Sequence, residues 1–341
     1  MKKFFILVLM LTAAISGCSE KKTEPVSRDL FAMDTYMNLK AYGDDSTLSA
    51  IDKAAEKIME FEELFSVTKE KSDIWNINHA EGRRVIVNKE TADIIKTSVQ
   101  IGSQSGGALD VTVYPVLRQW GFTTGEYQIP DSKTLALLLE NVDYRKITVD
   151  ENSVTVPKDV QIDLGALAKG YTGDAVMNIF RENGIESAIV NLGGNVQTLG
   201  KKPDGSMWKV AIRNPFQPDT ELGIVQVSDK AVITSGNYER YFIGEDGNSY
   251  CHIINPSTGK PAQSGIVSVT IVGEEGLVCD ALSTCLFIVG SDKAETIWRE
   301  REDFEMIIVT DDRRICLTEG LEKLFSPGDM CSDMKVEVIY R

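Results

Sequence analysis

The chain has 341 residues, a formal net charge of −15, and 43 % hydrophobic and 26 % charged residues. This composition is typical of a folded globular protein and excludes a largely disordered one. The acidic excess argues against nucleic acid as a partner and against a protein surface that recognises anionic lipid.

The N-terminus has the pattern of an export signal. Lys2 and Lys3 precede an apolar run from Phe4 to Ile15, which is shorter than the roughly 20 residues that a transmembrane helix needs. The sequence Ile15-Ser16-Gly17-Cys18 resembles a bacterial lipobox, in which the cysteine is lipidated after cleavage. A plain secretory signal that happens to contain a cysteine is the alternative.

The lipobox interpretation divides the chain into three parts. We expect a signal peptide over 1–17, a lipidated Cys18 with a polar tether over 18–29, and one folded domain over 30–341. It predicts an exported protein that is held by its lipid on the outer face of the cytoplasmic membrane.

The first half of the domain has mixed periodicities. Alternation from Phe31 to Ala41 predicts a half-buried strand. The spacing over Thr47 to Phe65 predicts an amphipathic helix, capped by Ser46 or Thr47. Its expected apolar side consists of Leu48, Ile51, Ala55, Ile58 and Leu64. Further elements are predicted as helices over 90–104, 112–119, 131–141 and 168–183, and as short strands over 146–149 and 154–157.

The second half is richer in strands. They are predicted over 187–190, 208–213, 222–227, 231–234, 266–272, 304–309 and 334–340, with helices over 278–289 and 292–301. Because helices and strands mix without strict βαβ alternation, the fold class is α+β. No GxGxxG follows a strand and opens a helix, which argues against a Rossmann nucleotide site.

Cysteine and histidine are sparse. Five cysteines remain beside Cys18. Their odd number and spacing match no zinc pattern, so we expect mostly buried thiols. A Cys316–Cys331 disulfide is left open. The only histidines are His79 and His252, which excludes a multi-histidine metal site, and His79 lies in a polar stretch that predicts exposure.

Three segments combine glycine with acidic, amide or basic residues. In 105–112, two glycines precede Asp110, and the alternatives are a ligand-binding loop or a helix-capping turn. In 163–171, Asp163 and Lys169 flank the start of a helix, which favours phosphate, although a solvated lysine is the alternative. In 190–195, a strand enters a Gly-Gly turn that is either a diphosphate-binding turn or an ordinary hairpin turn.

A fourth group spans 234–238, 252–261 and 280–284. Asp280 and Thr284 are four residues apart, so a helix places the carboxylate and the hydroxyl on one face. Two hard oxygens suit Mg²⁺, which takes few protein ligands. Alternatively, Asp280 caps the helix and Thr284 faces the core.

Together these segments resemble the ApbE family, the FAD:protein FMN transferases, over nearly all of the domain and in the family's order. The resemblance rests on 33–36, 65–66, 72–74, Asn78, 106–112, 120–122, 163–171, 191–195, 234–236, 252–261 and 280–284.

The resemblance implies a single two-lobed, T-shaped catalytic domain with FAD between the lobes, and it implies roles for individual residues. His252 aligns with the catalytic histidine. Thr68 stands where some members have tyrosine, which leaves its own role in doubt. The implied Mg²⁺ ligands are the main-chain oxygen of Ala166 and the side chains of Asp280 and Thr284. The implied FAD contacts are Met33, Thr68, Ala108, Leu109, Asp110, Asp163, Lys169 and Ile254.

The implied reaction is Mg²⁺-dependent transfer of FMN from FAD to a threonine hydroxyl of another protein, with release of AMP. His252 is expected to take the hydroxyl proton, because an ordinary imidazole titrates at about 6.5. The expected partners are FAD, acceptor proteins with FMN-binding domains such as extracytoplasmic flavoproteins or membrane redox complexes, and the membrane through the lipid. Three alternatives remain: hydrolysis of FAD to FMN and AMP, simple flavin binding, and binding of another solute.

Overall fold

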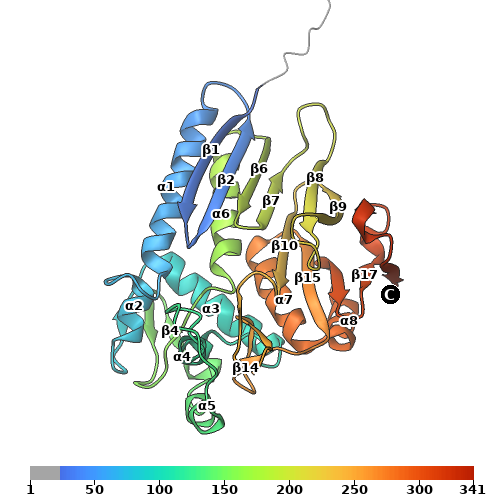
Figure 1. Ribbon diagram of the computed structural model, residues 1–341. Coiled ribbons are helices and arrows are strands. Elements are labelled where there is room, and N and C mark those ends of the chain that lie inside the picture. Colours follow the sequence, from blue (N-terminus) through green and yellow to red (C-terminus); the bar gives the residue numbers. More distant parts are fainter. Residues whose placement is uncertain (1–23) are drawn as a thin grey trace, which may run out of the picture.

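The computed structural model describes residues 24–341 as two lobes stacked along the long axis of the molecule (Figure 1). The upper lobe contains the large sheet and the helices that cover it. The lower lobe contains the segments between residues 66 and 167. The predicted signal peptide over 1–17, the predicted lipidation site Cys18 and most of the predicted tether lie outside the described residues.

Within residues 24–341, the upper lobe is built on a sheet of nine strands in the order β1-β2-β6-β7-β10-β15-β16-β17-β19. Neighbouring strands are antiparallel except β17 and β19, which are parallel. The strands are β1 (Val26–Ala32), β2 (Thr35–Tyr42), β6 (Ser187–Leu192), β7 (Asn195–Leu199), β10 (Ala231–Gly236), β15 (Ile266–Gly273), β16 (Phe304–Thr310), β17 (Arg314–Thr318) and β19 (Lys335–Ile339).

Both faces of the middle of this sheet are covered. Because side chains alternate along a strand, Val232 of β10 packs with the small sheet β18-β9-β8, whereas Ile233 packs with the helices. All residues of β15 are buried for the same reason. The covering elements are α1 (Thr47–Phe65), α6 (Ala168–Glu182), α7 (Gly276–Val289), α8 (Ser291–Arg299), β8 (Trp208–Arg213), β9 (Glu221–Val227) and β18 (Phe325–Pro327).

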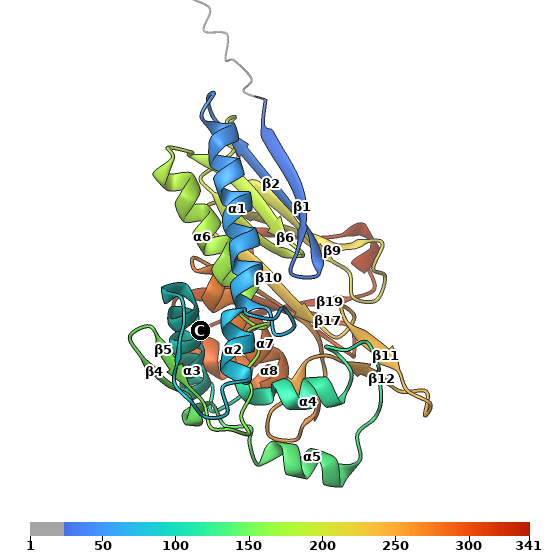
Figure 2. The same cartoon turned by 90° about the vertical axis from the view of Figure 1, so that its left-hand side faces the viewer.

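The lower lobe is mostly helical and has a small sheet of order β3-β5-β4. Its core includes Phe61 and Phe65 from the end of α1 and Ala281 and Cys285 from α7, so helices of the upper lobe fix the two lobes together (Figure 2). Its elements are α2 (Asp73–Asn78), β3 (Val85–Ile86), α3 (Lys89–Gln104), η1 (Val111–Val113), α4 (Tyr114–Gln119), α5 (Ser132–Leu139), η2 (Tyr144–Lys146), β4 (Thr148–Asp150) and β5 (Ser153–Thr155).

Most of the predicted elements and the α+β class are confirmed. The helix over Thr47–Phe65 has the predicted bounds. The single strand expected from Phe31 to Ala41 is wrong, because Met33 and Asp34 form a two-residue turn that separates β1 from β2. Both have positive φ, 49° and 58°, as the mirror-image turns favoured in hairpins require. Leu48 was wrongly placed on the buried side of α1, because its side chain is 57 % exposed.

The cysteine and histidine expectations agree with the structure. In the described part of the chain, Cys251, Cys279, Cys285, Cys316 and Cys331 are all buried and free. The left-open Cys316–Cys331 disulfide is therefore not formed. His79 is exposed as predicted and its ring stacks on Trp75. None of the helices within 24–341 has the length and apolar character needed to span a bilayer.

Candidate active site

A cavity of about 1000 Å³ lies where the tip of the β1–β2 hairpin, the β6–β7 turn, β10 and α7 meet the lower lobe. Ten of the twelve site residues predicted within the folded domain line it. They are Met33, Leu109, Asp110, Asp163, Ala166, Lys169, His252, Ile254, Asp280 and Thr284.

Thr68 and Ala108 are the two predicted residues that do not line the cavity. Thr68 lies in the loop after α1, where its backbone N–H donates to Ser66 Oγ at 3.2 Å. Ala108 is buried in the core of the lower lobe, directly before the lining residue Leu109. Their predicted FAD contacts stay predictions.

Asp280 and Thr284 lie one turn apart on α7 and both face the cavity, as their spacing predicted. Asp280 is in the helix interior and does not cap it. Its Oδ2 accepts a hydrogen bond from Gly170 N at 2.9 Å, and burial raises the pKa of the carboxyl. Thr284 Oγ1 lies 3.3 Å from Ser235 Oγ. A buried carboxylate beside a hydroxyl in a water-accessible cavity is a donor set that fits a hard divalent cation.

The turn before α6 supplies the opposite polar wall. Asp163 precedes Gly165 and accepts a hydrogen bond from its N–H, and Ala166 follows in the same turn. Burial raises the pKa of Asp163, whereas the nearby positive charges of Arg240 and Lys169 lower it. Lys169 stands in the first turn of α6, so an ammonium and a helix N-terminus act on the same space, an arrangement that favours a phosphate.

Asp110 acts as a helix cap at the edge of the cavity. It caps η1, because Oδ1 accepts hydrogen bonds from Thr112 N at 2.9 Å and Thr112 Oγ1 at 2.6 Å. Its Oδ2 accepts from Tyr144 N at 3.0 Å. The capping interpretation is therefore confirmed, and the residue lines the cavity as well. Burial raises the pKa of this carboxyl.

His252 stands directly after β12 (Ser249–Cys251) at the other side of the cavity. Its Nδ1 lies 3.1 Å from the carbonyl oxygen of Arg240. A proton on Nδ1 donates to this carbonyl and leaves Nε2 as the free base. Burial and then the Arg240 guanidinium lower the pKa of His252 from 6.5 to about 4. The ring is therefore neutral at pH 7. Its pKa is lower than the ordinary value of about 6.5 that was expected from the sequence.

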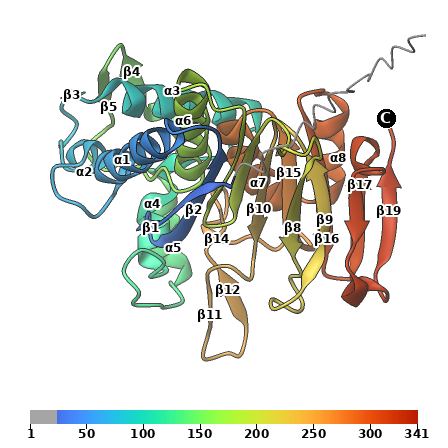
Figure 3. The ribbon, with the colours of Figure 1, turned by 90° about the horizontal axis from the view of Figure 1, so that it is seen from above.

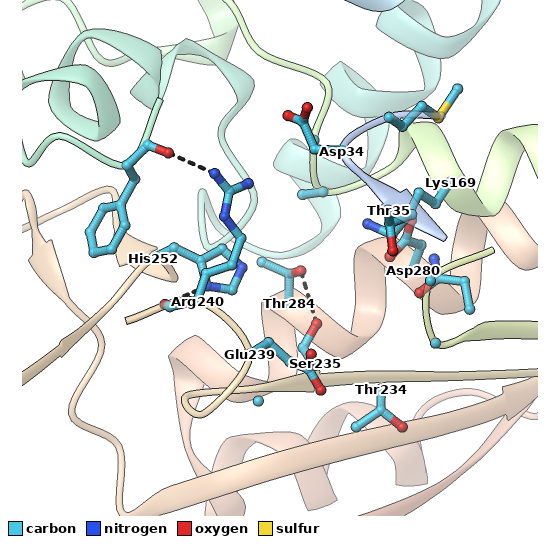
Figure 4. A pocket seen from close by; sticks show the side chains of 18 of the residues that line it. Asp34, Thr35, Lys169, Thr234, Ser235, Glu239, Arg240, His252, Asp280 and Thr284 are labelled. Carbon is cyan, nitrogen blue, oxygen red and sulfur yellow. Dashed lines mark hydrogen bonds between the residues drawn. The ribbon is translucent and has the colours of Figure 1, made fainter. Parts of the chain in front are cut away.

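Arg240 is a cavity residue that the sequence reasoning missed. Its guanidinium donates to the carbonyl oxygen of Phe122 at 2.7 Å and faces the cavity next to His252 (Figure 4). Lys169 and Asp280 lie together at the other side of the same view, and Thr284 lies between the two groups. The segment 234–238 of the fourth group in the sequence ends two residues before Arg240. A basic residue so close to the end of this segment was the signal that could have identified Arg240.

The fold and the site define an α+β protein with a polar cavity suited to a large phosphate-bearing ligand. A family model described as the ApbE family matches residues 33–308. The chain belongs to the ApbE family.

Similar proteins extend over almost the whole chain. A relative from Klebsiella pneumoniae (strain 342), named FAD:protein FMN transferase, is 32 % identical over 296 residues, which is 85 % of this chain and 91 % of the relative. A Vibrio cholerae relative of the same name is 30 % identical over 90 % of this chain and 94 % of its own.

Solved structures agree with the fold. The ApbE protein from Thermotoga maritima superposes with a TM-score of 0.83 at 28 % identity, over 88 % of this chain and 99 % of that one. The flavin transferase ApbE from Vibrio cholerae gives a TM-score of 0.77 at 25 % identity, over 84 % and 94 % of the two chains.

Proposed function

We propose that this protein is a Mg²⁺-dependent FAD:protein FMN transferase, which moves FMN from FAD to a threonine hydroxyl of an acceptor protein and releases AMP. One observation carries the proposal. A single cavity holds a neutral histidine, three basic side chains and a buried carboxylate–hydroxyl pair. The names of the relatives support the same activity.

Asp280, Thr284 and the main-chain oxygen of Ala166 would hold the Mg²⁺. The fit rests on Asp280, a buried carboxylate with a single backbone donor that faces a cavity instead of the core. When bound, the ion would reduce the negative charge of the diphosphate that otherwise repels a nucleophile.

His252 acts as the general base. The acceptor hydroxyl loses its proton to Nε2 as its oxygen attacks the FMN-side phosphorus, and the bond from that phosphorus to the bridging oxygen breaks, so AMP leaves with this oxygen. Because its pKa is about 4 in the free protein, the ring is already deprotonated at neutral pH. A bound diphosphate raises this pKa, since a nearby negative charge favours the imidazolium, and so makes the base stronger. A positioned base of this kind contributes about 10²–10⁴-fold in rate.

Lys169 and Arg240 bind the phosphates from two sides of the cavity. Asp163, at the turn before α6, faces both of these positive charges. The apolar residues Met33, Leu109 and Ile254 are left to contact the flavin ring and its ribityl chain.

The test is flavin transfer to a folded FMN-binding domain that carries a threonine acceptor motif. Purified protein without residues 1–18 is mixed with FAD, Mg²⁺ and this domain, and the intact mass and in-gel fluorescence of the domain are measured. We expect a gain of one FMN, lost with EDTA. His252→Ala should abolish it, whereas His79→Ala, at the exposed histidine, should not. Free FMN and AMP without any change in acceptor mass would instead identify an FAD hydrolase.

We also propose that Cys18 carries the lipid and that the domain works outside the cytoplasm, close to membrane redox proteins or extracytoplasmic flavoproteins. The polar residues after Cys18 support this placement. Metabolic labelling with a fatty-acid analogue and membrane fractionation test it. Cys18→Ala should lose both the label and the membrane association, and a variant that keeps the label would contradict the assignment.

A further inference from the structure

A hairpin of two short strands, β11 (Tyr241–Ile243) and β12 (Ser249–Cys251), rises from the wall of the cavity. It begins directly after Arg240 and ends directly before His252. The His252 N–H donates to the Arg240 carbonyl oxygen at 3.0 Å and closes its base. Figures 2 and 3 both show the hairpin projecting beyond the neighbouring elements. Its base belongs to the active site, and its tip lies in solvent.

Aromatic stacking holds one face of this hairpin in place. Phe242 stacks on Tyr127 with the ring centroids 5.0 Å apart and on Tyr250 with the centroids 5.3 Å apart. Tyr250 in turn packs 5.2 Å from Trp120, whose Nε1 donates to Gly259 O at 2.7 Å. The lower lobe therefore supports one face of the hairpin.

The other face of the hairpin has large apolar side chains without a covering element. Tyr241 and Ile243 alternate along β11 and point to the same side, and they are 49 % and 60 % exposed. On the supported side, Tyr127, which stacks on Phe242, and Ile129 of the same segment are still 47 % and 46 % exposed, so apolar surface is exposed on both sides of the hairpin. A cluster of exposed large apolar residues on a folded protein marks an interaction surface.

The position of the hairpin decides which molecule covers it. In the proposed function FAD fills the cavity and needs no apolar surface outside it. An acceptor hydroxyl must come within about 3 Å of His252. A folded protein that brings a hydroxyl so close covers the rim of the cavity, since a stable contact buries about 800 Å² on each partner. The hairpin ends directly before His252, so this partner lies against it.

The charges around the hairpin define the partner further. Glu245 and Asp246 lie at its tip, Glu126 directly precedes Tyr127, and all three are exposed. Asp246 is held by hydrogen bonds from Asn248 and Tyr250, whereas Glu245 has no hydrogen-bonded partner among residues 24–341. An acidic border around apolar residues is complementary to an apolar surface with basic residues at its edge.

We propose that the β11–β12 hairpin, with Tyr127 and Ile129, is the docking surface for the acceptor protein, and that the acceptor presents an apolar patch with basic neighbours beside its modified threonine. The proposal rests on the transferase activity proposed above. The residues of this chain that select the acceptor then lie outside the cavity and are separate from those that bind FAD.

The test compares Tyr241→Ser/Ile243→Ser with a matched control, Met330→Ser/Val336→Ser. The control residues are 52 % and 41 % exposed near and on β19, which Figure 3 shows far from the hairpin. Steady-state transfer of FMN to a folded acceptor domain is measured together with FAD affinity and thermal stability. We expect the hairpin variant to raise KM for the acceptor at least tenfold with unchanged FAD affinity and melting temperature, and the control to change none of these. Glu245→Lys should raise KM more at low salt than at high salt.

The outcomes separate the two proposals. Transfer by the unchanged chain together with an unchanged KM in the hairpin variant would overturn the docking surface alone. Equal loss of acceptor and FAD affinity would also overturn it, since the hairpin would then only support the cavity. Failure of the unchanged chain to modify any acceptor, with FAD bound, would overturn the transferase and the docking surface together.

Discussion

The carbonyl oxygen of Arg240 accepts a hydrogen bond from the backbone N–H of His252 at 3.0 Å and lies 3.1 Å from Nδ1 of the same residue. One carbonyl therefore fixes both the backbone and the ring of the proposed base. The Arg240 side chain turns away from this carbonyl to Phe122 and the cavity. Substitution of Arg240 thus changes the electrostatics at His252 while the carbonyl stays.

Arg240→Leu should raise the pKa of His252, because the guanidinium is one of the groups that lower it to about 4. The neutral ring is the active form, so the acid limb of kcat/KM should move to higher pH, and activity should be lost first at low pH. Arg240→Lys keeps the charge and should leave the limb in place. We expect kcat/KM at pH 8 to fall about 10–100-fold in Arg240→Leu, the usual effect of losing a charged hydrogen bond. A pH–rate profile from 3.5 to 8.5 checks this, and identical limbs in both variants would contradict it.

Asp280 and Thr284 should decide the metal requirement. Asp280→Ala removes the only carboxylate of the proposed ligand set, so transfer should fall by at least about 10²-fold, given that metal ions supply several kcal/mol in such reactions. Thr284→Ser keeps the hydroxyl and should need about as much Mg²⁺ as the wild type, whereas Thr284→Val should need more. Mg²⁺ titration of activity, and of the stabilisation by FAD in a thermal melt, measures both. Equal Mg²⁺ demand in the Ser and Val variants would remove Thr284 from the ligand set.

Gly170→Ala should destabilise the protein, because α6 and α7 touch at this residue. A Cβ here would lie 2.3 Å from the carbonyl oxygen of Gly276 and 2.7 Å from Cβ of Asp280. Overpacking of this kind costs about 1–3 kcal/mol. It should also weaken the hydrogen bond from Gly170 N to Asp280 and reduce transfer. Urea unfolding checks the stability, with Asn178→Ala on the exposed side of α6 as the control; a Gly170→Ala variant as stable as that control would contradict the close contact.

Asp174 holds the start of α7, since its two carboxylate oxygens accept from Gly276 N at 2.7 Å and Leu277 N at 2.8 Å. In Asp174→Asn the side chain has only one oxygen that can accept from these two N–H groups. The free energy of unfolding should therefore fall by about 1–2 kcal/mol. Burial raises the pKa of Asp174 from 3.8 to about 6. Because the folded state binds the proton more tightly than the unfolded state, the folded wild type becomes more stable as pH falls from about 6 toward 4. The difference in free energy of unfolding between the wild type and Asp174→Asn, here called the gap, should therefore widen by about 1 kcal/mol between pH 7.5 and pH 5. Urea unfolding at both pH values measures the gap, and a constant gap would show that the pKa is not raised.

Local sequence signals were enough for the elements that have strong periodicity or a clear stop. The helix over Thr47–Phe65 was found at its bounds, and Gly184, with φ 75°, ends α6 as expected. Leu48 shows the weakness of the same method. Periodicity places it beside buried residues, but no other element covers it, and only the packed structure contains that information. The turn at Met33–Asp34 was missed because neither residue is the glycine or asparagine that usually marks a positive φ.

The site shows the same difference between features that local sequence predicts and features that depend on tertiary packing. Spacing along one helix placed Asp280 and Thr284 on a common face, because 3.6 residues per turn fixes that relation locally. The contact between Asp280 and Gly170 joins residues that are 110 positions apart, and no periodicity carries it. The same holds for Arg240, whose effect on His252 depends on the closure of the β11–β12 hairpin.

The sequence by itself determined the α+β class, most helices and strands and the set of residues that resemble the ApbE family, since each depends on neighbours along the chain or on motifs in a fixed order. The tertiary structure alone decided which of those residues share the cavity, how far burial and Arg240 lower the pKa of His252, and which apolar side chains remain uncovered beside it. Burial and electrostatic interaction depend on distances between segments that are remote in the chain, and these distances exist only after the two lobes have packed together.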